Sequence, residues 1–581
     1  MDWYKAILTT FLFCVGIFAR SADLQSVQEN VQENVHGDLQ SPWLWGNNAA
    51  ALTRFTGSNI GVAELSLTKS KGGFTDFSDS PDALSVDASV ESFFRLSRRA
   101  VVYGAMSYTN FSGHDMSGSA FIQSLPTSSP LLVEHTATSQ SSRHLPFDIV
   151  EDSLTNTGTK HQDTYRLTGG LGYDLGNGIS LGARLGYTAA NYAKYKDLRH
   201  KNKLMDLDLT AGLYWPVSLS DNMAVCLGAN YLYHRTTESL QFSTYGKNDK
   251  VYNSLISYAN FMGHVEQFGS TGYTDKSREM PLVSDYNGVG VQLHLSPAAS
   301  HSSPATSHLS LYQSFTYAHR RGYYGRQSPY TITYTGHESD LYSYDAQLSV
   351  RSTRGSRFSL DLSLNAENLR NDAANYRELQ NEQGATNYEY YTPVKTANKL
   401  WTDGTVAFTA ELGNSRTCPH IPLWLFRAGL NWHHREQTAY VYPYGRRQDI
   451  SSKELFLSLS RNLFMHKKSK PDSCQTYFTF ALDFSFLKGS GQPYEDMTYQ
   501  APSDKQEFPP VMDAWLWREY MWLTAAQFRV GGSVKYSFIM PWTGLRTYML
   551  LSLSHRKANE TSEYSLGRNR TAMTFAVGCN F

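Results

Sequence analysis

The segment from residue 570 to residue 581 alternates strictly between two kinds of side chain. The apolar series is Met573, Phe575, Val577, Cys579 and Phe581, and the interleaved small or polar series is Ala572, Thr574, Ala576, Gly578 and Asn580. Successive side chains of a β-strand point to opposite faces of the sheet. The segment therefore predicts a strand with one apolar face and one small or polar face.

The same alternation recurs along the chain in segments long enough, at about 9 to 11 residues, to cross a bilayer as tilted strands. Eighteen such segments are predicted, at 60–68, 84–96, 100–110, 163–175, 179–190, 204–215, 223–234, 286–295, 308–318, 340–351, 358–368, 404–412, 424–433, 453–461, 476–487, 525–537, 545–555 and 570–581. Strands of soluble β-sandwiches, the alternative class, usually have only about five or six residues.

The connections between these segments alternate between short, as at 97–99 and 176–178, and long, as at 111–162 and 235–285. Bacterial transmembrane barrels have an even number of strands, short periplasmic turns and long surface loops. The sequence therefore predicts an all-β fold, a transmembrane antiparallel up-and-down β-barrel of about 18 strands (16–20). Both termini are expected in the periplasm, the loops outside the cell, and the protein in the outer membrane.

Composition excludes a helical membrane protein. Of the 581 residues, 41% are hydrophobic, and no run after residue 22 reaches the roughly 20 apolar residues that a membrane helix needs. Each barrel strand shows only every second side chain to lipid, so a mean hydropathy of −0.42 fits this class. The formal net charge of zero predicts no strong preference for anions or cations.

The N-terminus predicts export. Residues 1–21 contain Lys5, an apolar run over 6–19 and a small-x-small cleavage site, as a secretory signal peptide does. The barrel, residues 59–581, then follows a segment at 22–58 that is too short for the folded plug of an energy-coupled receptor. Within this segment we expect an aromatic stretch either to enter the lumen as a hatch or to pack against the wall, with candidate residues Trp43, Trp45, Asn47 and Asn48.

Charged side chains of both signs recur at the strand positions that alternate with the apolar ones, here called the inward phase. The lumen-lining candidates are Arg166, Arg184, Asp206, Asp208, Asp345, Asp361, Glu411, Arg427, Asp483, Arg529 and Lys535. A barrel of about eighteen strands is wide enough to hold water, so these groups either line a pore or pair across a filled interior.

Three long connections carry candidate binding residues, since binding sites concentrate on loops. Trp515, Trp517, Tyr520 and Trp522 in 488–524 and the tyrosines of 369–403 suit sugars, lipids or peptides, or equally loops that fold inward over the pore. The basic stretch 194–203 predicts either a contact with lipopolysaccharide phosphates or a solvated loop tip.

No motif points to catalysis, a cofactor, a metal or nucleic acid. The only histidine doublet, His433 and His434, would point to opposite faces of its strand, which is poor geometry for a metal. The mature cysteines lack zinc-binding or redox spacing, although Cys418 and Cys474 fall in turns on the same predicted rim and could pair there. A hydrolase assembled from distant Ser, His and Asp residues stays open.

The terminal strand resembles the closing strand of bacterial outer-membrane barrels, which implies that Phe575, Val577 and Phe581 are read by the barrel-insertion machinery. Residues 43–52 are similar to the hatch segment of the long-chain fatty-acid channel superfamily, with Asn48 in place of its proline. The terminal strand, residues 47–52 and residues 192–203 together resemble a family of outer-membrane β-barrels from Bacteroidota.

That resemblance implies transport or assembly, with a surface lipoprotein or nutrient-uptake receptor as partner. We therefore expect a monomeric channel for small or amphipathic solutes. The alternatives are a closed barrel whose loops bind a partner protein or surface ligand, and an outer-membrane hydrolase.

Overall fold

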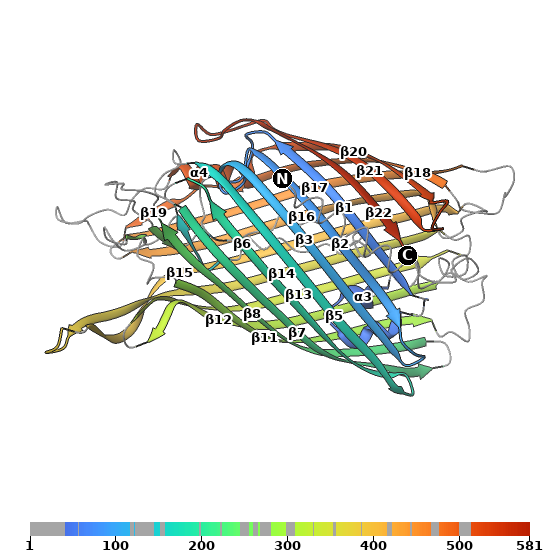
Figure 1. Cartoon of the computed structure of the whole chain (residues 1–581), viewed down its shortest axis with the longest axis horizontal. Helices are drawn as coiled ribbons and strands as arrows, with labels where there is room; N and C mark the ends of the chain where they lie inside the picture. Colours follow the sequence, from blue (N-terminus) through green and yellow to red (C-terminus); the bar gives the residue numbers. More distant parts are fainter. Residues whose placement is uncertain are drawn as a thin grey trace.

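Eighteen long strands form one closed sheet in the described part of the chain (Figure 1). The computed structural model describes residues 41–55, 57, 59–116, 121, 145–150, 157–196, 199–220, 223–243, 255–258, 265–267, 280–297, 308–328, 331–352, 356–384, 386–414, 421–441, 444–465, 476–498 and 513–581. The barrel strands are β1 (Ile60–Lys71), β2 (Asp82–Arg95), β3 (Ala100–Met116), β5 (Gly158–Gly176), β6 (Ile179–Lys194), β7 (Arg199–Ser220), β8 (Met223–Ser243), β11 (Met280–Pro297), β12 (His308–Ser328), β13 (Thr331–Arg351), β14 (Arg357–Gln380), β15 (Thr386–Asn414), β16 (Pro422–Val441), β17 (Tyr444–Met465), β18 (Thr476–Gly491), β20 (Gln527–Ile539), β21 (Arg546–Ala558) and β22 (Asn569–Asn580).

The first and last strands close the barrel. They pair antiparallel from Val62↔Asn580 to Lys71↔Thr571, and Gly61 and Phe581 exchange two backbone hydrogen bonds of 2.7 and 2.8 Å just beyond this ladder. All eighteen predicted segments are strands of this barrel, so the predicted fold class is confirmed. Recognition of Phe575, Val577 and Phe581 by the barrel-insertion machinery stays a prediction.

The two ends of the barrel differ. Short turns join strands at one end, here called the turn end, where the hairpin between β5 and β6 has positive φ angles at Gly176, Asn177 and Gly178. Positive φ is what a tight hairpin requires and what Gly and Asn tolerate. The opposite end is called the loop end. The placement of the turn end in the periplasm stays a prediction.

The outer surface of the barrel is apolar. On β5, for example, Leu167 and Leu171 are 51% and 47% exposed, and exposed Leu, Val, Phe and Tyr side chains recur at every second position of the other strands. In a bilayer every backbone group must be paired within the protein, which a closed barrel achieves. The chain is therefore an outer-membrane β-barrel with this face toward lipid.

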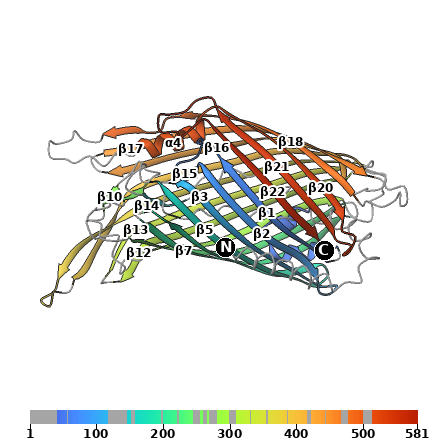
Figure 2. The same ribbon diagram turned by 45° about the horizontal axis from the view of Figure 1, so that its top comes forward.

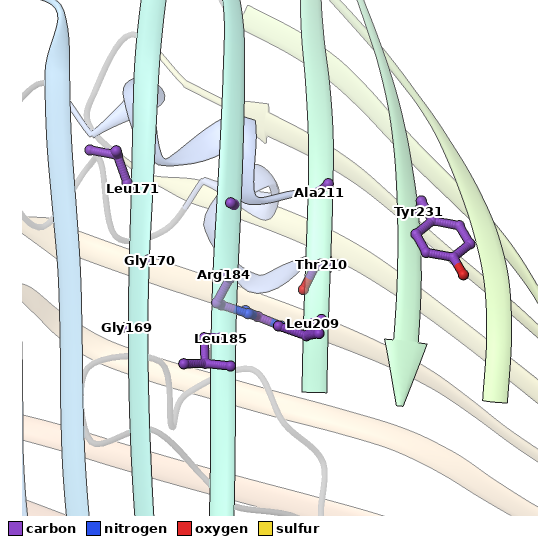
Figure 3. Close-up of a pocket in the computed structure, with 10 residues that line it drawn as sticks. Gly169, Gly170, Leu171, Arg184, Leu185, Leu209, Thr210, Ala211 and Tyr231 are labelled. Atoms are coloured by element: carbon purple, nitrogen blue, oxygen red, sulfur yellow. The ribbon is translucent and has the colours of Figure 1, made fainter. Parts of the chain in front are cut away.

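An apolar hollow of about 580 Å³ lies on the wall over β5 to β8 (Figure 3). Small outward residues, Gly169, Ala183 and Ala211, form its floor, and larger ones, such as Leu171 and Tyr231, surround it. Acyl chains cover such a depression in a bilayer.

The predicted loop at 369–403 is wrong, because β14 and β15 continue through it. Their ladder runs on to Gln380↔Thr386, and the resulting hairpin projects beyond the loop end in both views (Figures 1 and 2). Tyr388, Tyr390 and Tyr391 therefore lie on a strand rather than a loop. Favourable cross-strand pairs extend the ladder beyond the neighbouring strands, which alternation alone did not reveal.

The predicted solvated basic loop at 194–203 is also wrong for most of its residues. Strand β6 continues to Lys194 and β7 begins at Arg199. Lys194, His200 and Asn202 are buried on the inward phase, whereas Lys196, Lys201 and Lys203 are exposed. A contact of these exposed lysines with lipopolysaccharide stays a prediction.

The remaining elements are short. They are α3 (Pro42–Trp45), the 3-10 helix η1 (Ala49–Arg54), α4 (Asp513–Thr524), β19 (Glu495–Thr498), which pairs with β17, and a small sheet of β4 (Phe147–Val150), β9 (Leu255–Tyr258) and β10 (Val265–Gln267). Helix α4 and β19 replace part of the loop predicted at 488–524. Within the described ranges, the helices fall short of the length and apolar character needed to cross a membrane.

We predict that Leu551→Arg destabilises the barrel by about 2–4 kcal/mol, because it places a charge on the lipid face of β21. Ser552→Arg is the matched control, since Ser552 is the next residue on the same strand and points inward. The measurement is urea unfolding in lipid vesicles. An equal loss of stability in both variants would contradict the assignment of the two faces.

Candidate functional site in the barrel interior

A short N-terminal stretch, residues 42–54, lies on the inner wall near the turn end and is called the inner segment below. It contains α3 and η1, and η1 contacts β5, β6 and β7. Figure 1 shows α3 within the outline of the barrel, at the end where the chain terminates. Figure 3 shows the segment behind the strands that carry the lipid-facing hollow.

Five inward glycines on four neighbouring strands form the seat of the inner segment. A Cβ atom would overlap Ala49 if built on Gly182, and Asn48 if built on Gly212. The same addition would crowd Leu52 at Gly170 and Gly172, and Asn48 and Trp43 at Gly228. Glycine within a strand often marks the close approach of another backbone. This glycine floor therefore lets η1 lie directly on the wall.

Asn48 is the main polar anchor of the inner segment. Its Oδ1 accepts from the Ala50 backbone N–H at 3.1 Å and caps η1. Its Nδ2 donates to the Leu213 carbonyl and to Gln292 Oε1, both at 2.9 Å. One buried side chain thus both starts the helix and fixes it to β7 and β11.

Trp43 is the main apolar anchor and is 2% exposed. Its ring packs edge-on against Tyr214 and Tyr312, with centroids 5.0 and 5.3 Å apart, and its Nε1 donates to His294 Nδ1 at 3.2 Å. Ala50, Ala51 and Cys226 complete this buried cluster. Of the other two hatch candidates, Asn47 accepts a hydrogen bond from Arg184 at 3.4 Å, and Trp45 belongs to α3.

The eleven lumen-lining candidates all lie on the phase opposite to the exposed apolar residues. Most contact a different neighbour on the wall. Asp361 accepts from Gln347 at 2.7 Å, Arg427 lies over Phe456, and Lys535 lies over Tyr548. Asp345, Glu411, Asp483 and Arg529 lie on separate strands. The inner wall is therefore polar and mixed in charge, while its role as a pore lining stays a prediction.

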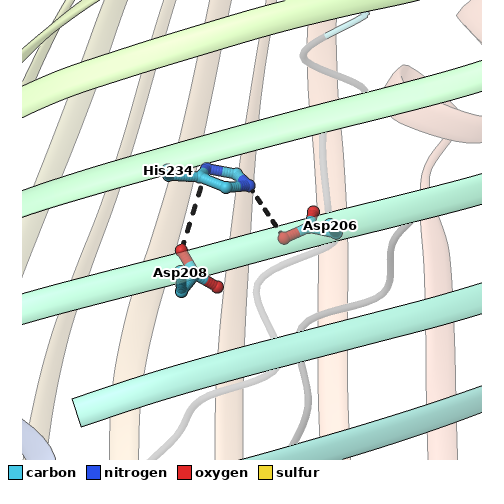
Figure 4. Close-up of side chains that lie close together, drawn as sticks. All are labelled: Asp206, Asp208 and His234. Atoms are coloured by element: carbon cyan, nitrogen blue, oxygen red, sulfur yellow. Dashed lines mark hydrogen bonds and ion pairs between the residues drawn. The ribbon is translucent and has the colours of Figure 1, made fainter.

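Two of these candidates form a compact group with a histidine (Figure 4). Asp206 and Asp208 on β7 flank His234 on β8, with His234 Nε2 2.9 Å from Asp206 Oδ1 and Nδ1 4.0 Å from Asp208 Oδ1. The sequence analysis did not single out His234. The alternation of β8 predicts that the His234 side chain points inward. Only the register between β7 and β8 shows that His234 lies opposite Asp208.

Helix α4 lies against the inner face of the wall at the loop end. Its Glu519 forms a two-point ion pair with Arg435 of β16, at 2.9 and 2.8 Å, with both side chains buried. Its Arg518 donates to Thr75 Oγ1 at 3.0 Å, and burial lowers the pKa of Arg518. Removing one partner of such a buried pair leaves an uncompensated charge, so the pair fixes the position of α4.

The aromatic residues proposed as surface ligand sites belong to this helix. Trp515 is buried, and Trp517, Tyr520 and Trp522 pack partly buried against a cluster of Phe74, Met521, Ala525 and Ala558. The Tyr520 hydroxyl donates to the Gly491 carbonyl at 2.9 Å. These contacts explain the aromatic clustering by packing, and binding of a surface ligand there stays a prediction.

A second inward contact at the loop end involves residues 145–147, where β4 begins. The Phe147 ring is buried against Tyr324, and Lys399 donates to the carbonyls of Leu145 and Pro146 at 3.1 and 2.9 Å. Tyr324 and Lys399 are inward residues of β12 and β15. The interior is thus occupied near both ends. The inner segment lies at the turn end, and residues 145–147 and α4 lie at the loop end.

Three histidines lie close to a serine or a carboxylate, which are the partners of histidine in a serine hydrolase. His433 pairs with Asp403 through Nδ1 at 2.6 Å, without a hydroxyl at Nε2 among the described residues. His434 meets both Ser451 and Asp449 at the same nitrogen, at 2.9 and 3.6 Å. His337 contacts Ser284 at 2.8 Å, but no described group is hydrogen-bonded to its Nδ1. None of the three links a hydroxyl and a carboxylate through opposite nitrogens, as a proton relay requires.

The described cysteines are free. Cys226 is buried and accepts from the Tyr214 hydroxyl at 2.9 Å, and Cys579 lies on the lipid-facing phase of β22. Cys418 and Cys474 lie outside the described residues, so their pairing stays a prediction.

The chain is similar to several solved outer-membrane proteins at low sequence identity. No curated protein matches the sequence. The ferric preacinetobactin receptor BauA from Acinetobacter baumannii shares 9% identity with a TM-score of 0.39, over 90% of this chain and 80% of that chain. The outer membrane transporter YddB from Escherichia coli shares 8% identity with a TM-score of 0.37, over 90% and 80%. The ferric citrate transporter FecA shares 9% identity with a TM-score of 0.36, over 89% and 78%. These values describe an overall likeness and carry nothing about substrates.

A family model matches residues 137–581, which includes the terminal strand and residues 192–203 but begins after the inner segment. The Bacteroidota origin and the likeness of residues 43–52 to a fatty-acid channel hatch stay predictions. Because the match covers more than half of the chain, this protein belongs to the family of unknown function DUF6850.

Proposed function

We propose that this chain is an outer-membrane transport barrel that conducts small or amphipathic solutes, and that the inner segment and α4 set the width of the path. The observation that carries the proposal is the seat of the inner segment. The segment lies on the glycine floor and is anchored there by side chains such as Asn48 and Trp43. It can leave this seat without breaking a hydrogen bond between barrel strands.

The packing beneath the inner segment supports this reading. A cavity of about 50 Å³ is lined by Leu44, Leu52, Phe93, Tyr103 and Arg184. Native cores contain few voids larger than a water molecule. The seat combines apolar rings with one guanidinium, a surface that suits amphipathic solutes. The mixed charges on the rest of the inner wall suit a wet path without strong ion selectivity.

The projecting hairpin of β14 and β15 favours a second candidate, a barrel that binds a partner protein. Beyond the pairs with β13 and β16, which end at Ala373 and Ala397, the two strands pair only with each other. Tyr390 and Tyr391 are 43% and 46% exposed there. A surface lipoprotein or uptake receptor would be the partner. The hydrolase candidate lacks support from the three histidines described above.

We predict that deleting residues 22–58 raises the single-channel conductance of the purified barrel in planar bilayers, because it removes the inner segment. The wild-type barrel is expected to show a smaller, steady conductance. Both proteins must show the heat-modifiable mobility of a folded barrel. Silence of both forms would contradict conduction and favour the partner-binding candidate.

We also predict that Gly182→Ala displaces the inner segment and exposes Cys226, because the added Cβ overlaps Ala49. The measurement is maleimide labelling of Cys226 after Cys418, Cys474 and Cys579 are replaced by Ser. We expect labelling at least about tenfold faster than in the parent, since a steric overlap of this kind costs about 1–3 kcal/mol. Gly169→Ala is the control, because a Cβ at Gly169 meets no atom within 4 Å. Equal labelling of all three proteins would show that the segment stays seated.

A further inference from the structure

We propose that Asp206, Asp208 and His234 bind a divalent transition-metal ion on the inner wall of the barrel. The inference goes beyond the proposed function and does not depend on conduction, since it concerns one group of side chains on β7 and β8.

The strand register builds the group. Asp208 lies directly opposite His234, and Asp206 lies opposite Thr236, two residues earlier on β7 and two residues later on β8. Residues two apart on a strand share a face, so both carboxylates and the imidazole project from the same side of the wall. One possible ligand atom from each residue lies within 4.8 Å of those of the other two.

The spacing is close to that of a coordination sphere. Two ligand atoms about 2.0–2.1 Å from a tetrahedral zinc ion are about 3.3 Å apart. The contact from His234 Nε2 to Asp206 Oδ1, at 2.9 Å, is close to this value, whereas the 4.0 Å contact to Asp208 Oδ1 is made by the other ring nitrogen, Nδ1. In Figure 4 the carboxylates face opposite nitrogens of the ring, so an ion held by His234 Nε2 and Asp206 requires the exposed Asp208 carboxylate to turn toward it.

The surroundings restrict the orientation of these side chains. The Tyr286 ring stacks on the imidazole, with centroids 4.6 Å apart and planes inclined by 14°. Thr236 Oγ1 donates to Asp206 Oδ2 at 3.0 Å. Hydrogen-bonded neighbours of this kind orient metal ligands and raise affinity.

The donor set indicates the class of ion. Imidazole nitrogen suits zinc, copper, nickel and iron, carboxylate oxygen suits harder ions, and no thiolate is present to favour a soft ion. Two carboxylates balance the charge of a divalent cation. Three protein ligands leave a further position for water or for a ligand that the ion carries.

Access to the group and the charges near it determine how tightly an ion is expected to bind. The Asp208 side chain is 62% exposed, so an ion in the interior can reach the group. Arg166 interacts electrostatically with Asp206, Arg184 with Asp208, and Arg320 with His234. These cations oppose the binding of another positive charge, so we expect them to weaken the affinity for Zn²⁺.

The test is isothermal titration of the full-length barrel in detergent with Zn²⁺, repeated with Co²⁺ while visible absorption is recorded. We expect one equivalent of Zn²⁺ to bind. Asp206→Asn, Asp208→Asn and His234→Gln should each weaken binding more than tenfold and remove the Co²⁺ absorption bands. His319→Gln is the matched control, because His319 pairs with one carboxylate, Asp340, at 3.0 Å and should leave binding unchanged.

Two results would overturn the proposal: no saturable binding by the wild-type barrel, or unchanged binding by a folded variant that carries all three substitutions. Folding is checked by heat-modifiable mobility. A barrel that conducts but does not bind Zn²⁺ would remove this inference alone, and a barrel that binds Zn²⁺ without conducting would remove only the proposed function.

Discussion

The backbone ladder between β1 and β22 is the contact on which the rest of the structure depends. In the hydrocarbon region an unpaired backbone N–H or C=O costs several kcal/mol, so a sheet with free edges is not stable there. Pairing from Val62↔Asn580 to Lys71↔Thr571 removes both edges. Closure also gives every strand one lipid-facing and one inward phase, and so makes an enclosed polar wall possible.

The inner wall is built in two ways. Most of it consists of polar side chains that contact one another or nearby rings, such as Asp361 with Gln347 and Lys535 with Tyr548. Near the turn end, five glycines form part of the wall, and the inner segment lies where their side chains would be. This second arrangement allows motion, because the segment is held by packing and a few hydrogen bonds and not by strand pairing.

The loop end is organised by long-range contacts. The ion pair between Arg435 and Glu519 joins residues 84 positions apart, and Lys399 reaches carbonyls more than 250 positions earlier in the chain. A buried ion pair does not necessarily add stability over apolar packing, but it specifies one arrangement strongly, because either charge alone would be buried without compensation. Helix α4 therefore has a defined position inside the wall.

The sequence by itself determined the class of fold, the eighteen strands and the inward or outward phase of each residue, because a period of two is a local property of a strand. It did not determine where strands end beyond the membrane, as the hairpin of β14 and β15 shows, because cross-strand pairs fix those ends. Nor did it assign a role to the inward glycines at 170, 172, 182, 212 and 228, or bring His234 to Asp208. Only the tertiary structure decided these, since they depend on register between strands and on which distant segment fills the barrel.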